Sequence, residues 1–256
     1  MLLAWLGAVA IGLSLGLLGS GGSIITVPVL VYLVGQPEKI AVAGSLGVVG
    51  AIASIGALQN VARGQIDWRS VLWFGLPGMA GTYAGALLSG HVSGAVQLAV
   101  FAVVMLAASV MMFRRSGYQP TGGAARPVAK VVADGLAVGL MTGFVGVGGG
   151  FLILPALVLL GGLTMRVALG TSLAIISLNA FTGFFKHLHL LSAQELSLDW
   201  KVLGTFVLLG AVGSLVGGSF ANRVPQATLR RAFAVFLMLM AVFILYESGP
   251  RALLGD

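Results

Sequence analysis

The feature that most constrains this chain is a series of long apolar segments that carry almost no charge. A transmembrane helix needs about 20 mainly apolar residues. Segments of this kind follow one another along the chain at 40–60, 70–90, 94–113, 166–185, 202–221 and 229–247. Charged residues make up only 8% of the chain, against about a quarter of a soluble globular domain. The sequence therefore predicts an all-α polytopic membrane protein and excludes water-soluble enzymes and disordered chains.

Two further apolar stretches, 2–35 and 131–162, are each too long for one ordinary span. A glycine-rich run interrupts each stretch, Gly-Ser-Gly-Gly-Ser at 19–23 and Gly-Val-Gly-Gly-Gly at 146–150. The first stretch contains no Lys or Arg, so it lacks the positively charged start of a cleaved signal peptide. We therefore predict two glycine-broken helix pairs in the folded protein.

The second half of the chain repeats the first. Residues 18–28 align with 145–155, and Ile-Asp-Trp at 66–68 matches Leu-Asp-Trp at 198–200. Glycine pairs at a spacing that favours close helix packing recur in both copies: Gly12/Gly16, Gly81/Gly85, Gly139/Gly143 and Gly213/Gly217. The repeat predicts two homologous transmembrane halves, 1–113 and 131–256. Each half has a glycine-broken helix pair or re-entrant hairpin plus three spanning helices.

The segment 114–130 between the halves is rich in Arg, Lys, Pro and Gly, which predicts a cytoplasmic linker. If each broken stretch returns to its starting side, the two repeats are inverted. The linker side then holds ten of the fourteen Lys and Arg residues, and the other side holds Lys39, Lys186, Lys201 and Arg251. If each stretch crosses once, the repeats are parallel and the cations divide nine against five. We favour the inverted arrangement, and the parallel one stays open.

Ionisable side chains give little sign of chemistry inside the predicted spans. No Asp or Glu lies in the middle of a span, although a proton-driven antiporter usually buries a carboxylate there. The chain has no cysteine, and its histidines have no companion carboxylates at metal-ligand spacing. No basic cluster with interleaved aromatic residues points to a nucleic acid. We therefore predict no enzymatic reaction, no cofactor, no metal and no nucleic-acid partner; the lipid bilayer is the expected surrounding.

The two glycine-rich breaks are the main candidates for a binding site. Backbone amides exposed at a break, together with the dipole of the following half-helix, bind an anion without a charged side chain. Broken helices near the bilayer midplane are also where secondary transporters hold their substrates. The alternative is that the glycines only permit a tight bend and close packing. The candidate residues at the breaks are Ser20, Gly21, Gly22, Ser23, Gly148, Gly149 and Gly150.

Polar residues in the following helices could complete this site. Ser45, Thr171 and Ser172 are expected at helix starts, where their hydroxyls either bind the anion or cap and back-bond the helix. Asn179 lies inside a span and needs a partner, which is either another helix or the substrate.

Two equivalent pairs are expected at the far ends of these helices. They are Gln59 with Asn60, and Lys186 with His187. Lys186 and His187 either attract anions into a vestibule or anchor the helix at the membrane interface.

The paired motif Gly-x-Gly-Gly-(Ser/Gly)-x-x-x-x-Pro, at 19–28 and 146–155, resembles the TauE/SafE sulfite exporter family, also called the toluene sulfonate uptake permease family. The resemblance covers essentially the whole chain. It implies a multi-pass carrier of the bacterial inner membrane for sulfur-containing anions such as sulfite, sulfoacetate or other organosulfonates. It also implies that the glycine motifs lie near the transport path.

Our expectation is therefore a secondary transporter, an exporter, for a small sulfur oxyanion or organosulfonate. The alternatives are an anion channel or facilitator, and an uptake permease coupled to H⁺ or Na⁺. Sodium coupling stays open because backbone carbonyls at broken helices bind sodium.

Overall fold

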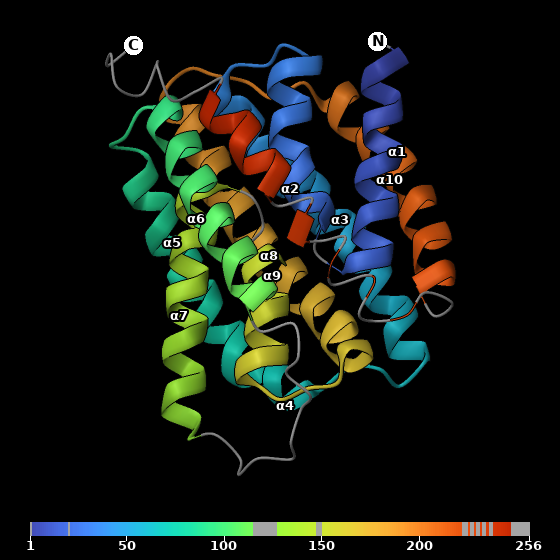
Figure 1. Ribbon diagram of the computed structural model, residues 1–256. Helices are drawn as coiled ribbons and strands as arrows, with labels where there is room; N and C mark the ends of the chain where they lie inside the picture. The colour runs from blue at the N-terminus through green and yellow to red at the C-terminus, as the bar shows by residue number, and fades with distance from the viewer. Residues whose placement is uncertain are drawn as a thin grey trace.

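The computed structural model describes residues 2–19, 21–114, 127–146, 150–221 and part of 225–246. Every regular element in these ranges is a helix, as the apolar sequence predicts (Figure 1). The helices before the linker are α1 (Leu2–Leu18), α2 (Gly21–Pro28), η1 (Val29–Leu33), α3 (Glu38–Ala62), α4 (Trp68–Ser70), η2 (Val71–Gly75), α5 (Leu76–Ser89) and α6 (Gly94–Arg114). Those after it are α7 (Val128–Val145), α8 (Gly150–Pro155), η3 (Ala156–Leu160), α9 (Met165–Ala193) and α10 (Trp200–Ala221).

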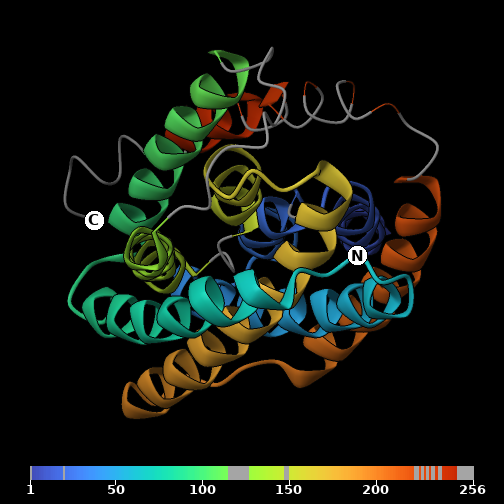
Figure 2. The same ribbon diagram turned by 90° about the horizontal axis from the view of Figure 1, so that it is seen from below.

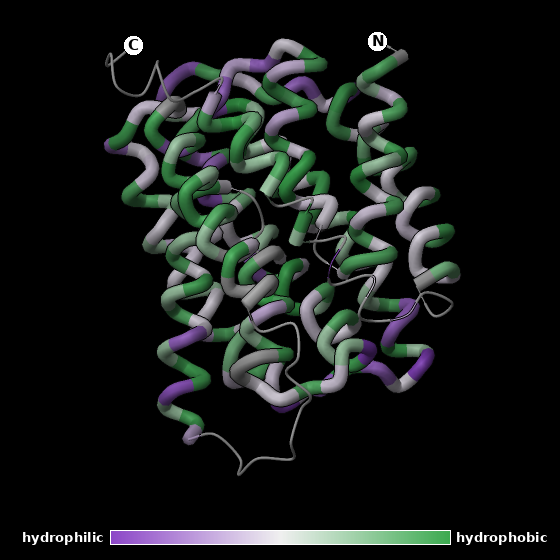
Figure 3. Tube along the Cα trace, in the orientation of Figure 1, coloured by the Kyte–Doolittle hydropathy of each residue, from purple (hydrophilic) through white to green (hydrophobic). Residues whose placement is uncertain are grey.

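Within the described residues, five helices are long and apolar enough to cross a membrane. They are Glu38–Ala62, Trp68–Ser89, Val128–Val145, Met165–Ala193 and Trp200–Phe220. These helices identify a multi-pass membrane protein. Figure 3 shows hydrophobic residues along the lengths of the helices and hydrophilic residues gathered mainly at their ends. Most of the predicted linker, and much of the predicted span 229–247, lie outside the described residues, although 238–246 is helical.

Both predicted helix breaks are confirmed. α1 ends at Leu18 and α2 begins at Gly21, while α7 ends at Val145 and α8 begins at Gly150. Beyond each break, the second helix contains a proline and continues as a π-helical turn, η1 or η3. Proline has no N–H for the preceding turn, so the hydrogen-bond register shifts by one residue after Pro28 and Pro155.

The first broken stretch folds back on itself. Gly7 of α1 lies beside Val29, and Gly22 of α2 lies against Ile11, so α1 and α2 pack antiparallel. The second stretch likewise returns toward its starting end, because Val128 at the start of α7 and Gly161 after η3 line the same cavity. Figure 1 shows α1 starting at the upper end of the molecule and α7 at the lower end.

The central pair of helices is α3 and α9, which run antiparallel. Gly47 of α3 lies against Phe184, and Gly56 lies against Leu173. Much of each helix is buried, so these two helices form the centre around which the others pack. The α9 helix is longer than the predicted segment 166–185, because its apolar pattern continues to Ala193.

Two parallel pairs flank this centre, α1 with α10 and α5 with α7 (Figure 2). In both pairs the backbones touch directly. A Cβ atom added at Gly12 would lie 1.9 Å from the Gly210 carbonyl oxygen, and one at Gly139 would lie 2.1 Å from the Gly78 carbonyl oxygen. The predicted packing role of the small-residue spacings is therefore confirmed at these crossings.

We expect Gly213→Ala to destabilise the protein and Gly204→Ala, in the same helix, to leave it unchanged or slightly stabilised. The new Cβ at Gly213 would lie 2.5 Å from the Val9 carbonyl oxygen, whereas the one at Gly204 would have no atom within 4 Å. Overpacking of this kind costs about 1–3 kcal/mol. Thermal unfolding in detergent measures the difference. Equal melting temperatures for the two variants would contradict the close packing of α1 against α10.

Candidate functional site

The two breaks have the same backbone geometry. Gly19 and Gly146 adopt left-handed conformations, with φ of 67° and 75°, which glycine accepts without strain. The Gly19 N–H donates to the Leu15 carbonyl and the Gly146 N–H to the Thr142 carbonyl, at 2.8 Å each. A single bond of this kind from a left-handed residue ends an α-helix. The glycines therefore terminate α1 and α7 in the interior of the protein.

A serine from the opposite half of the chain holds each break. Ser172 of α9 donates its hydroxyl to the Gly19 carbonyl at 3.1 Å. Ser45 of α3 donates to the Gly146 carbonyl in a short hydrogen bond of 2.5 Å. Both hydroxyls are fully buried. These crossed bonds attach the two breaks to the central helix pair.

The serines do not lie where the sequence analysis placed them. Ser45 and Ser172 were expected at helix starts, but α3 already begins at Glu38 and α9 at Met165. The single O–H proton of each serine is shared between the break carbonyl and a carbonyl three residues earlier in its own helix, at 2.8 Å for Ser45 and 2.9 Å for Ser172, which is the back-bonding of the alternative interpretation. Thr171, also expected at a helix start, accepts a hydrogen bond from the backbone N–H of Asp67 at 2.8 Å, away from the breaks.

The glycines at the start of α2 have a packing role. Gly22 lies against the Ile11 carbonyl, and Gly21 lies against the Ser14 hydroxyl, so a side chain at either position would clash with α1. Ser23 and Gly150 are also buried. The other candidates at the breaks, Ser20, Gly148 and Gly149, lie outside the described residues.

Asn179 lies on α9 with no exposed surface, and neither polar atom of its amide has a hydrogen-bond partner among the described residues. A Cβ atom at Gly78 of α5 would lie 2.8 Å from the Asn179 nitrogen, so the amide faces the α5–α9 contact. Leaving a buried polar group unpaired costs about 1–3 kcal/mol. The interhelical hydrogen bond offered as one alternative for Asn179 is not formed in this structure.

Three further buried side chains were not among the predicted site residues. Thr82 and Ser214 each carry a hydroxyl without a partner, and they occupy matching positions in α5 and α10. Gln97 of α6 donates to the Phe144 carbonyl at 2.6 Å, two residues before the second break, and its side-chain oxygen is unpaired. The signal that could have identified them is the one that identified Asn179, which is a polar residue inside an apolar span.

The predicted vestibule residues do not gather in one place. α3 and α9 are antiparallel, so Asn60 lies near Gly170 at the start of α9, far along the helix from Lys186. The Asn60 amide donates to the carbonyl of Gly56 at 2.8 Å. Gln59 lies near Gly218 of α10, where its side-chain oxygen would be 3.1 Å from an added Cβ.

Lys186 and His187 both contact other residues near the C-terminal end of α9. The Lys186 ammonium lies 5.0 Å from the centre of the Tyr83 ring. His187 is buried, and its Nε2 atom lies 3.0 Å from the Gly143 carbonyl oxygen. These residues lie two turns inside α9, because that helix extends beyond its expected end.

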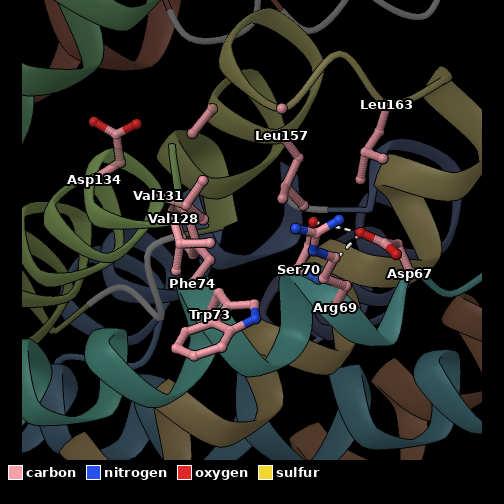
Figure 4. Close-up of a pocket in the computed structure, with 12 residues that line it drawn as sticks. Asp67, Arg69, Ser70, Trp73, Phe74, Val128, Val131, Asp134, Leu157 and Leu163 are labelled. Carbon is pink, nitrogen blue, oxygen red and sulfur yellow. Dashed lines mark hydrogen bonds between the residues drawn. The ribbon is translucent and has the colours of Figure 1, made fainter. Parts of the chain in front are cut away.

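A cavity of about 270 Å³ opens at the end of the molecule where α4 and α7 begin (Figure 4). Asp67 caps α4 by accepting hydrogen bonds from the backbone and hydroxyl of Ser70. No local sequence pattern predicts this cavity, since three separate segments form it. Its lining residues include Asp67, Arg69, Ser70, Trp73, Asp134 and Leu157.

Comparison with known proteins identifies the family. The chain matches the family model described as Sulfite exporter TauE/SafE over residues 4–244. The chain belongs to this family. A relative from Xylella fastidiosa, named a probable membrane transporter protein, is 30% identical over 246 residues, which are 93% of this chain and 92% of the relative. Another from Haemophilus influenzae, with the same name, is 29% identical over 92% of this chain and 94% of its own length. No solved structure matches the chain significantly.

We expect Ser45→Ala and Ser172→Ala each to lower the stability of this TauE/SafE protein by about 1–3 kcal/mol, because each leaves a buried break carbonyl without its hydroxyl donor. Ser219→Ala is the matched control, since that exposed hydroxyl donates only to Leu215 of its own helix. Melting temperatures in detergent measure the effect. If all three variants have the same melting temperature, the crossed bonds do not stabilise the breaks.

We expect Asn179→Leu to keep or raise the melting temperature while abolishing transport. The substitution removes an unpaired buried amide, which relieves its desolvation penalty, and it also removes a polar group available to a substrate. Thr182→Val, one turn along α9, is the control because its hydroxyl bonds only within the helix. A joint fall in stability and transport for Asn179→Leu would instead assign the residue a structural role.

Proposed function

We propose that this chain is a secondary transporter that exports small sulfur-containing anions, such as sulfite, sulfoacetate or other organosulfonates, across the bacterial inner membrane. Its membership of the TauE/SafE family and the names of its relatives support a membrane transporter. The description of the family as a sulfite exporter supports the proposed sulfur-anion class and the proposed direction of transport. We assign it no enzymatic reaction and no cofactor.

The observation that carries the proposal is the crossed pair of serine–carbonyl bonds. Because Ser45 bonds to the second break and Ser172 to the first, both breaks adjoin the central helices rather than the lipid. In our proposal the anion lies between the two halves at these breaks, where backbone amides bind it. Asn179 follows Ser172 by two helical turns on the same face of α9, and it contributes an unpaired amide.

We further propose that the halves form an inverted repeat, with the linker 114–130 in the cytoplasm. The support comes from contacts that recur between sequence-equivalent positions. Gly12 meets Gly210 as Gly139 meets Gly78, and the two serine–carbonyl bonds are likewise equivalent. The antiparallel course of α3 and α9 agrees with inversion.

We expect the purified protein, reconstituted in vesicles, to carry at least one of sulfite, sulfate, thiosulfate, sulfoacetate and taurine with saturable kinetics. The same anion should raise the melting temperature, because a ligand that binds only the folded state stabilises it. Protein-free vesicles are the control. If none of these anions is transported and none raises the melting temperature of the protein, the proposed substrate class is wrong.

Imposed gradients then separate the alternatives. Flux that does not saturate and follows voltage alone would indicate a channel. Flux driven by a sodium or pH gradient would identify the coupling ion, and the direction of net movement under that gradient would distinguish export from uptake.

A further inference from the structure

Two turns at opposite ends of the molecule share one sequence pattern, which the proposed binding site does not use. Asp67-Trp68-Arg69 precedes α5, and Asp199-Trp200-Lys201 begins α10. Each aspartate caps the helix by accepting a hydrogen bond from the backbone N–H three residues later, at 3.1 Å and 3.2 Å. Each tryptophan is exposed, at 61% and 59%. The turns lie at opposite ends because they follow the antiparallel helices α3 and α9.

The first turn lines the cavity of about 270 Å³. The Arg69 guanidinium makes no hydrogen bond or ion pair with the part of the chain that the structure describes. Trp73, one turn further along, belongs to the same wall (Figure 4). The Oδ2 atom of Asp67 accepts both bonds from Ser70, and the Asp134 carboxylate points away from Arg69 in Figure 4. The donors that face this cavity are therefore available to an anion.

The second turn lies in a matching but closed environment. Asp199, Val202, Leu30 and Gln36 line it, at positions equivalent in the repeat to Asp67, Ser70, Leu157 and Leu163 of the open cavity. The volume that they enclose is about 0 Å³. Equivalent positions at the two ends thus line an open cavity at one end and a closed contact at the other.

We propose that the Asp-Trp-basic turns are the anion-capture sites at the two ends of the transport path, with Arg69 serving the open end and Lys201 the closed end. The inference rests on the proposed transport function. A guanidinium offers two parallel N–H groups to an oxyanion such as a sulfonate or sulfate, and a lysine ammonium offers a point charge. Movement that closes the cavity at Arg69 opens the matching one at Asp199, next to Lys201, which is exposed at that end of the molecule.

The first test is the concentration dependence of anion flux. Arg69→Ala raises the KM about tenfold or more, since hydrogen bonds to charged groups contribute at least that factor, and Arg69→Lys recovers part of the loss. Arg63→Ala is the control, because Arg63 lies on the same side and its guanidinium bonds to the Gly218 carbonyl. An unchanged KM in Arg69→Ala, with normal insertion and melting temperature, overturns the proposal while the transport function stands.

The second test does not need transport. The chain has no cysteine, so Ser70→Cys and Val202→Cys each introduce a single thiol at equivalent positions. In permeabilised membranes, where a maleimide reaches both sides, the thiol of Ser70→Cys reacts faster than that of Val202→Cys. Sulfate or sulfoacetate, neither of which reacts with maleimide, slows the labelling of Ser70→Cys but not that of Ser70→Cys combined with Arg69→Ala.

Each outcome of the labelling test has one meaning. Equal labelling at the two ends overturns the open and closed assignment. Protection that persists without Arg69, or no protection by either anion, overturns capture at Arg69. Protection by taurine alone overturns simple anion capture, because it requires a carboxylate of the cavity to bind the ammonium group. Failure of the wild-type protein to transport, with protection intact, counts against the proposed function and not against the capture site.

Discussion

The structure depends on one constraint, which is that backbone polar groups must find partners inside the protein when lipid surrounds it. A helix that ends in the interior leaves carbonyl groups without intrahelical donors. The chain ends two helices there, at Gly19 and Gly146, and buried hydroxyls from the other half bond to both terminal glycines. The crossed bonds therefore do more than fix a loop. Each half supplies the hydroxyl that the break in the other half needs. The two halves therefore have to pack together before the carbonyl groups at both breaks have partners.

The same reciprocity explains the glycine content. Parallel pairs of helices approach so closely that carbonyl oxygens occupy the space of missing side chains, at Gly12 in one pair and Gly139 in the other. Lipid offers little hydrophobic force between helices, so close packing supplies the attraction. In each pair, one helix belongs to the first half and one to the second. Neither half can bury these small-residue faces alone.

Sequence patterns predicted the parts of this fold that depend on local chemistry. Apolar length located the spans, and glycine runs located both breaks, because each of these signals acts within one segment. The positions of Ser45 and Ser172 were assigned to helix starts, since the apolar pattern does not mark where α3 and α9 begin. Sequence equivalence alone could not reveal that Ser45 bonds to the break of the other half. Asn179 was selected correctly as a polar residue within a span, whereas its lack of a partner depends on the packing of α5 against α9. The cavity at Arg69 arises from three distant segments, so no local signal predicts it.

The most informative departure from symmetry is at the two capped turns. Asp67 and Asp199 cap their helices in the same way, yet one turn borders a cavity and the other does not. The shared Asp-Trp-basic pattern does not produce this difference by itself. The side chains around the two turns also differ, with Ser70 and Leu163 at the open end and Val202 and Gln36 at the equivalent positions of the closed end. Two ends with equivalent chemistry and unequal openness are what a carrier requires, since a path open at both ends would act as a channel. In our proposal, the open cavity at Asp67 and the closed contact at Asp199 are the two ends of a carrier that opens them in turn.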